Sequence, residues 1–219
     1  MTGVYAAKLG DETDRLHERV RDRYALDSTD DRVWVGRGEM DITRGTLVLP
    51  GLYVMPRWNL LFPERGEAVP FTVTTAGIEV AGREALITQR AFIFDSKRRR
   101  FDSLTVYDAS RDRLFDFLGR DGHIVSELHP RVADGELIVE GGKQWLRAGG
   151  RYLPLAGPMA ATVEVRDRFL PDEDRFRVRA EVSNPLAGEI LGYTGRFTQT
   201  TDASAEPVEP CARPTTLPP

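Results

Sequence analysis

The stretch AATVEVRDRFLPDEDRFRVRAEVSN, residues 160–184, limits the possible folds most strongly because apolar and polar residues alternate along it. Apolar side chains recur at two-residue spacing on both sides of a PDED turn: Ala161, Val163, Val165 and Phe169 before it, and Phe176, Val178, Ala180 and Val182 after it. Successive side chains of a β-strand point to opposite faces of the sheet. The pattern therefore predicts a long hairpin with one apolar face and one densely charged face.

Further segments with a similar alternation follow one another along most of the chain, separated by turns rich in glycine and aspartate. They span residues 32–42, 69–80, 84–94, 99–108, 112–118, 122–129, 136–147 and 189–199. Strands at such short spacing are typical of an antiparallel meander, and a meander of this length must close or fold over to hide its edges. We therefore predict a mainly β fold, a meander closed into a calycin-like or lipocalin-like barrel or into a curved half-barrel.

Helical patterns are confined to the first 30 residues. Within residues 11–24, Leu16, Val20 and Tyr24 recur every four positions among charged residues, which predicts a surface helix packed by one apolar stripe. A second short helix is predicted over residues 4–9, where a glycine follows the last helical position. The strands and helices together predict that one or two N-terminal helices plug or flank the barrel.

The chain of 219 residues is predicted to form one domain, residues 1–199, with its helices inside residues 3–25. From Thr200 onward the sequence TTDASAEPVEPCARPTTLPP has proline in place of large apolar residues. This composition predicts a disordered tail over residues 200–219. The single cysteine, Cys211, lies in that tail, which excludes an internal disulfide and predicts a free, exposed thiol.

Charge and hydropathy exclude several classes of protein. A formal net charge of −4 argues against a dedicated nucleic-acid binder, because phosphate neutralisation requires positive charge on the binding face. The first residues lack a basic segment followed by a sustained apolar run, so we expect no secretory signal and a cytoplasmic protein. The most apolar window, residues 46–63, is interrupted by two prolines and an arginine and is shorter than the ~20 residues that a membrane-spanning helix needs.

The basic run in FDSKRRRFDS, residues 94–103, predicts a charged hairpin end with its turn at Asp95 and Ser96. In an extended chain Lys97 and Arg99 point to one face and the two remaining arginines to the other, so the run cannot form a single patch outside a loop. A solvated hairpin end is therefore favoured over a binding site for phosphate or carboxylate.

Three side chains are candidates for acid–base chemistry. Asp116 lies between two phenylalanines in RLFDFLG, and a carboxyl group in such surroundings can have a raised pKa and serve as an acid or a base. It could equally form a structural ion pair with Arg90 or Arg100. His129, at the end of HIVSELH, is a candidate general base, and Tyr107 is a candidate hydroxyl donor inside a barrel.

A second set of side chains is predicted to contact a bound small molecule: Arg90, Arg100, Tyr193, Trp58, Phe92 and Glu127. The two arginines are included because their strand neighbours are largely apolar, which could leave a guanidinium facing a cavity. Tryptophans and tyrosines in such a fold more often serve packing than ligand contact.

Metal and cofactor sites are not expected. Residues two apart on a strand lie ~6.6 Å apart, so Glu127 and His129 could reach one ion, but a general base or a simple polar strand face is the favoured interpretation. The sequence contains no GxGxxG, P-loop or GxSxG pattern, and therefore no nucleotide-binding or serine-hydrolase signature.

Several pieces of the chain together resemble the bacterial domain-of-unknown-function family numbered 4166. They are VYAAKLGDETDRLHERVRDRY, FPERGEAVPFTV, ITQRAFIFDSKRRRFDSLTVY and GPMAATVEVRDRFLPDEDRFRVRAEVSNPLAGEILGYTGRF. The resemblance extends to about residue 199. It implies an all-β body with a helical start, but no established activity and no catalytic residues. Relatives fused behind epimerase-like or saccharopine-dehydrogenase-like NAD-binding modules imply an association with small metabolites.

Three functions remain open from the sequence. The first is a barrel that binds an apolar or amphipathic small molecule. The second is a cofactor-independent enzyme of the cyclase or isomerase type, acting on a biosynthetic intermediate by positioning and acid–base catalysis. The third is an interaction domain that uses the charged face of residues 160–184 to bind a partner protein or a second copy, which would make a homodimer.

Overall fold

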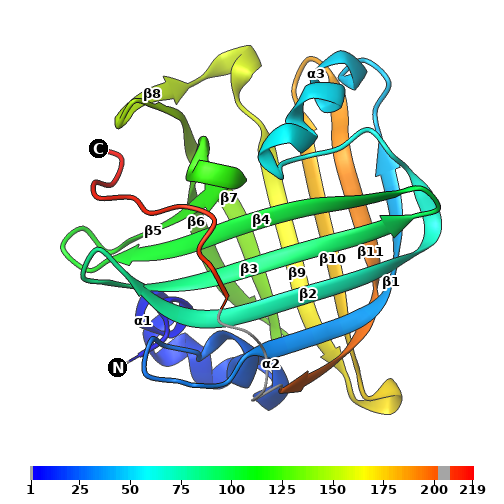
Figure 1. The fold of residues 1–219 in the computed structure, drawn as a ribbon. Helices are drawn as coiled ribbons and strands as arrows, with labels where there is room; N and C mark the ends of the chain where they lie inside the picture. The colour runs from blue at the N-terminus through cyan, green and yellow to red at the C-terminus, as the bar shows by residue number, and fades with distance from the viewer. Residues whose placement is uncertain (1, 202–207) are drawn as a thin grey trace.

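A computed structural model describes residues 2–201 and 208–219, and in it the meander closes into an antiparallel barrel (Figure 1). Ten strands form the ring: β1 Trp34–Arg44, β2 Gly66–Val80, β3 Arg83–Phe94, β4 Lys97–Asp108, β5 Arg113–Leu118, β6 Ile124–Ala133, β7 Glu136–Ala148, β9 Thr162–Leu170, β10 Arg175–Asn184 and β11 Gly188–Thr201. Pairing of β1 with β11, together with the pairs β6–β7 and β7–β9, closes the ring. The predicted closed barrel is confirmed.

The hairpin predicted from residues 160–184 is formed by β9 and β10. Its register pairs Phe176 with Phe169 and Ala180 with Val165, so the apolar face of both strands points into the barrel. Asp167, opposite Val178 in the same ladder, also points inward and is almost fully buried. The inner face is therefore apolar with one embedded carboxyl group, which the alternation alone had not indicated.

The N-terminal segment covers one end of the barrel, at the bottom of Figure 1. Helix α1, Val4–Leu9, is followed by a 3₁₀ turn, Gly10–Arg15, and by α2, Glu18–Tyr24. The predicted continuous helix over residues 11–24 is wrong because the chain is extended at Leu16 and begins a new helix after His17. The His17 ring accepts a hydrogen bond of 3.2 Å from the Arg19 amide and so caps that second helix.

The opposite end carries two elements that the periodicity did not predict. The apolar window between β1 and β2 contains helix α3, Leu49–Val54, and a 3₁₀ turn, Met55–Trp58. A proline stands in the first turn of each, a position where the missing amide hydrogen costs nothing. Among the described strands, β8, Arg151–Leu155, pairs with β7 alone and extends the sheet beyond the ring.

The C-terminal segment, residues 208–219, lies along the outer surface of the barrel rather than apart from it (Figure 1). Ala212 is 4% exposed and packs in a cluster with Phe117, Trp145 and other residues of the outer face. Tyr152 donates a hydrogen bond to the Thr216 carbonyl at 2.5 Å. The structure thus differs here from the predicted disorder, because the outer face of β3–β7 is itself apolar and the tail covers it; residues 202–207 of that prediction lie outside the described residues.

Large rings fill one side of the barrel interior. Phe71, Phe92, Phe176 and Phe197 make a chain of ring contacts across β2, β3, β10 and β11, with centroids 5.1 to 6.0 Å apart. Gly38 permits this packing, since a Cβ there would lie 2.6 Å from the Phe197 Cα. Within residues 2–201 and 208–219, none of the helices is long and apolar enough to cross a bilayer.

Candidate ligand chamber

On the interior side away from the large rings, inward-pointing side chains are less completely buried toward the end that carries α3 and β8 than beneath the helices. Several side chains there point inward by register and yet remain half-buried, so water-sized space lies beside them: Arg90, Phe101, Asp116, Leu118, Ile124, Val163, Val165 and Val182. Inward residues near the helices, such as Leu114 and Leu137, are by contrast fully buried beneath them. We call this space, bounded by the half-buried residues above, the chamber; it opens toward the end that carries α3 and β8.

Arg90 is the cation of the chamber. Its guanidinium lies over the Phe101 ring at 5.2 Å and donates one long hydrogen bond, 3.4 Å, to the Ser103 hydroxyl. Within the described part of the chain it forms no ion pair. Burial opposes its charge, but Tyr193, Asp116 and other neighbouring groups outweigh this effect and raise its pKa, so Arg90 stays positive.

Asp116 is the acidic group of the same chamber. It accepts a hydrogen bond of 2.9 Å from the Thr105 hydroxyl, its partner across β4 and β5. Burial raises the pKa of this carboxyl group, while Arg90 and the hydroxyls of Thr105 and Ser103 partly offset the rise. Asp116 and Arg90 therefore influence one another electrostatically without direct contact, which leaves hydrogen-bonding capacity on both for a third group.

Tyrosines form the floor between the chamber and the helices. Tyr5 of α1 lies within hydrogen-bonding reach of Thr105 and stacks edge-on against Tyr24 of α2, with centroids 4.9 Å apart. Tyr193 of β11 lies beside Arg90 and is 5% exposed. Burial raises the pKa of all three phenols, so they stay neutral hydrogen-bond donors.

Below the floor lies a buried charge pair. Arg23 Nε is 3.4 Å from Asp167 Oδ2, close enough for an ion pair but not aligned as a hydrogen bond. Arg23 also donates to Gln199 Oε1 at 2.7 Å and lies over the Phe197 ring. Asp167 Oδ1 has no hydrogen-bond partner among the described residues, and burial raises the pKa of this carboxyl group despite the nearby cation.

The structure assembles only part of the predicted site. Arg90, Asp116 and Tyr193 meet in the chamber, and Phe92 contributes to its wall of rings, fully buried. Trp58 stands at the rim, half exposed, with its ring edge against His123. Tyr107 also points inward, so six of the nine candidates lie at inward or rim positions. Tyr107 lies near α1, however, and its hydroxyl donates a hydrogen bond of 2.9 Å to Asp112 rather than facing Asp116.

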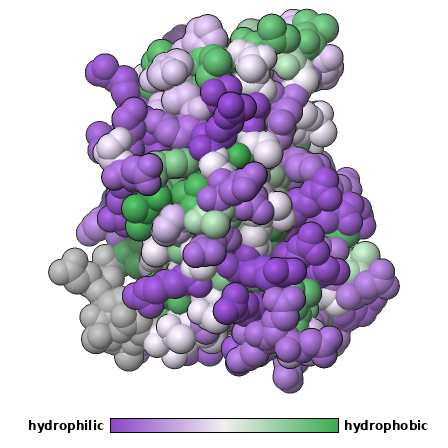
Figure 2. Space-filling model, turned by 90° about the vertical axis from the view of Figure 1, so that its right-hand side faces the viewer, coloured by the Kyte–Doolittle hydropathy of each residue, from purple (hydrophilic) through white to green (hydrophobic). Residues whose placement is uncertain are grey.

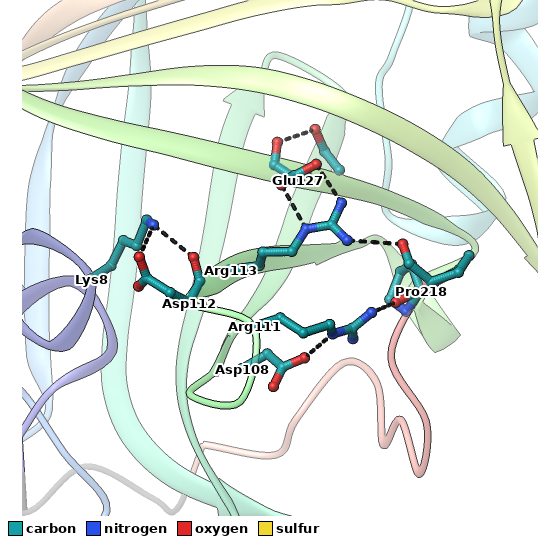
Figure 3. A network of polar contacts seen from close by, with 9 residues as sticks. Lys8, Asp108, Arg111, Asp112, Arg113, Glu127 and Pro218 are labelled. Atoms are coloured by element: carbon teal, nitrogen blue, oxygen red, sulfur yellow. Dashed lines mark hydrogen bonds and ion pairs between the residues drawn. The ribbon is translucent and has the colours of Figure 1, made fainter.

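Three candidates point away from the interior, so the structure does not bring them into the chamber. Arg100 is on the outer face and pairs with Asp102 at 2.9 Å. Glu127 is also on the outer face and binds the Arg113 guanidinium through both of its oxygens (Figure 3). His129, two residues further along β6, is exposed on the same outside surface. Both faces of these strands carry apolar residues, because the C-terminal segment covers part of the outer face. The sequence pattern therefore did not indicate which face points into the barrel.

The basic hairpin end adopts the predicted form. Asp95 and Ser96 form the turn of β3–β4, and Arg99 binds Glu64 through two hydrogen bonds, one of 2.8 Å. Arg98 is exposed beside the 3₁₀ turn that follows α3, where it lines a cleft with Pro56. The run is therefore divided between a local ion pair and a solvated surface.

Sequence reasoning did not identify Tyr5, Arg23 or Asp167 as neighbours of the chamber. Their signal was present as an aspartate within an apolar strand face and an arginine and tyrosines in a short helix, but nothing in the sequence indicated that these segments meet. No cluster of metal-binding side chains occurs in residues 2–201 and 208–219.

Residues 16–197 match a family described as a domain of unknown function, DUF4166. The chain belongs to this family. The DUF4166 chain is 31% identical over 186 residues to a Bacillus subtilis (strain 168) relative, the uncharacterized protein YndH, covering 83% of this chain and 90% of that protein. A crystal structure of a protein provisionally named thioesterase II, from Thermobifida fusca YX, covers 77% of this chain and 78% of that one at 8% identity and a TM-score of 0.22. At that TM-score it supports no functional argument.

Proposed function

We propose that this DUF4166 barrel binds an amphipathic small molecule whose anionic group contacts Arg90. The observation that carries the proposal is that Arg90 points into the barrel interior, among other incompletely buried side chains, and has no carboxylate within ion-pair distance in the described chain. A buried cation without a counter-ion is unfavourable unless something supplies the charge. A carboxylate or a phosphate would do so.

The surroundings fit an apolar body on such a ligand. Phe101, Leu118, Ile124 and Val165 present apolar surface to the chamber, whereas the polar groups gather at its inner end. Small-molecule sites commonly combine apolar walls with a few convergent polar groups. An amphipathic molecule would therefore lie with its anionic group inward, near Arg90 and Tyr193, and its apolar body toward the open end.

Native mass spectrometry of the purified protein, compared with an organic extract of the denatured sample, tests for a retained molecule and gives its mass. Binding of a long-chain fatty acid and of the alcohol of the same length is then measured for the wild type, Arg90→Met and Arg98→Met. We expect Arg90→Met to weaken binding of the acid by about tenfold to a hundredfold, as for loss of a hydrogen bond to a charged group, and to leave the alcohol unaffected. Arg98→Met, on the solvated hairpin end, should match the wild type. If Arg90→Met lost the same affinity for the acid and the alcohol, or lost affinity for neither, the proposed contact between Arg90 and the anionic group would be contradicted.

A cofactor-independent enzyme is the second candidate function, and one observation favours it. Asp116 has a raised pKa and lies in the same chamber as Arg90, so it could donate a proton to a bound molecule while Arg90 stabilises developing negative charge. If the molecule recovered from the protein is converted on incubation, Asp116→Asn should abolish conversion and retain binding. Conversion at the wild-type rate in that variant would exclude Asp116 as the acid.

A further inference from the structure

Exposed apolar side chains gather at the open end of the barrel. Eight of the nine large hydrophobic side chains that are exposed in the described residues belong to the segments drawn at the top of Figure 1: Leu47, Tyr53, Val54, Trp58, Leu146, Leu153, Met159 and Leu186. We call these eight residues the rim. Figure 2 shows green side chains along the upper edge, where α3 lies, above a mostly purple strand surface. Apolar exposure concentrated at one end of a protein marks an interaction surface.

Charge is distributed along the same axis. The open-end segments, residues 44–67, 95–100, 119–123, 147–161 and 185–189, contain ten arginines and lysines against five acidic residues. At the helical end, residues 2–33, 109–112, 134–135 and 171–174 contain seven basic and thirteen acidic residues. A chain of net charge −4 therefore presents a positive end that coincides with its apolar end.

The composition of the rim fits the boundary between lipid and water. Leu47 and Leu186 are 76% and 75% exposed, and Tyr53 and Trp58 are aromatic residues with a polar atom on an apolar ring. Such aromatic residues are enriched at the level of lipid headgroups. Arginines near them, including Arg57 and Arg98, would meet anionic headgroups, to which each nearby cation adds affinity.

We infer that the open end docks on the surface of an anionic phospholipid bilayer, with the rim inserted among headgroups and the chamber facing the lipid. An amphipathic molecule could then pass between bilayer and chamber without crossing water; this part of the inference rests on the proposed function, and the docking itself does not. A second copy of the chain fits the open end less well than an anionic bilayer does. A symmetric dimer would bring the same positive patch against itself, and like charges would repel.

Vesicle flotation tests the docking with the full-length protein. Phosphatidylcholine vesicles are compared with vesicles that also contain phosphatidylserine. We expect binding to the anionic vesicles only, weakened by added salt. Leu47→Ser/Tyr53→Ser/Leu186→Ser, which changes three of the eight rim side chains, should lose binding.

Two double variants test whether binding depends on the position of the positive charges or only on the net charge of the protein. Arg57→Gln/Arg98→Gln should reduce the partition constant about thirtyfold, because each cation near the surface contributes about fivefold. Arg168→Gln/Arg175→Gln makes the same change of charge at exposed positions toward the helical end and should have little effect. No flotation, equal flotation on both vesicle types, or equal effects of both charge variants would overturn the docking. So would a discrete dimer in sedimentation that the serine variant dissociates, since the rim would then bind a second copy.

Arg90→Met distinguishes failure of the docking from failure of the proposed function. We expect this variant to float like the wild type while it loses fatty-acid affinity, and we expect the serine variant of the rim to bind the fatty acid in solution like the wild type. Wild-type fatty-acid affinity in Arg90→Met would refute the ligand contact and leave the docking intact.

Discussion

The Tyr24 hydroxyl donates a hydrogen bond of 2.8 Å to Asp167 Oδ2, which joins the second N-terminal helix to strand β9 through the floor of the chamber. The same carboxylate oxygen lies 3.4 Å from Arg23 Nε. One acidic side chain of the barrel thus binds two consecutive residues of the helix that closes its end. The helical cap is held by a buried polar contact as well as by the apolar packing of Val4, Leu16 and Val20.

Tyr24→Phe should destabilise the protein because it removes that hydrogen bond and keeps the ring in place. Loss of a hydrogen bond to a charged group costs about 1.5–3 kcal/mol, measured as the change in unfolding free energy in urea. Tyr53→Phe removes a hydroxyl from an exposed tyrosine of α3 and should change stability little. Equal effects of the two substitutions would mean that the contact with Asp167 contributes nothing.

Asp116 should make the protein less stable as the pH rises. Burial raises its pKa in the folded state, so above its ordinary value of 3.8 the folded protein holds this proton more tightly than the unfolded chain does. The stability contributed by the proton is present below 3.8 and is lost as the pH rises through the raised folded pKa. The free energy of unfolding is measured across this window for the wild type and for Asp116→Asn, which has no titrating carboxyl group at this position. As the pH rises, the wild type should lose stability relative to the variant.

Asp112 supplies a control of opposite sign for that pH series. Lys8, which binds its carboxylate in Figure 3, and the Tyr107 hydroxyl both lower the pKa of Asp112. The stability that Asp112 contributes is therefore present above 3.8 and is lost as the pH falls. Asp112→Asn should lose stability relative to the wild type near neutral pH and recover it in acid. The same pH trend in both variants would contradict the assignment for Asp116.

Val165→Phe should fill the chamber. Val165 points inward from β9 and is half-buried, so a larger side chain has space to occupy. We expect fatty-acid affinity to fall at least about tenfold with little change in stability, because overpacking costs about 1–3 kcal/mol only where the interior is already full. Ile93→Phe, on the exposed outer face of β3, is the control. A destabilised variant with unchanged binding would show that the space beside Val165 is not the binding site.

Cys211 should react slowly with thiol reagents. Burial raises the pKa of its thiol to about 12, so the reactive thiolate is scarce at neutral pH. Arg111 and Arg113 fasten the tail through the carbonyls of Pro218, at 2.6 Å, and Pro219, at 3.0 Å (Figure 3).

Arg111→Met/Arg113→Met should therefore increase the labelling rate of Cys211 several-fold by loosening the tail. Arg213→Met removes an exposed tail arginine whose ion-pair partner among the described residues is Glu209, and it should leave the rate unchanged. Fast labelling of the wild type would show that the tail does not cover its thiol in solution.

Local pattern in the sequence determined the β class, the hairpins and the first helix of this protein, because strand alternation and helix ends depend on neighbours along the chain. Only the tertiary structure decided which side of each strand faces the chamber where both sides are apolar. On β5, Phe115 and Phe117 are as buried as Leu114, yet they lie under the C-terminal tail and not inside the barrel.

The same reason explains the site. Arg90 and Arg100 stand in similar local sequence, but the pleat turns one inward and the other outward by a difference of register. The meeting of Tyr5, Tyr24 and Asp167 required a helix to be placed against a strand more than 140 positions away. Such long-range contacts depend on closure of the barrel and on the shape that its side chains leave unfilled, and no local pattern encodes them.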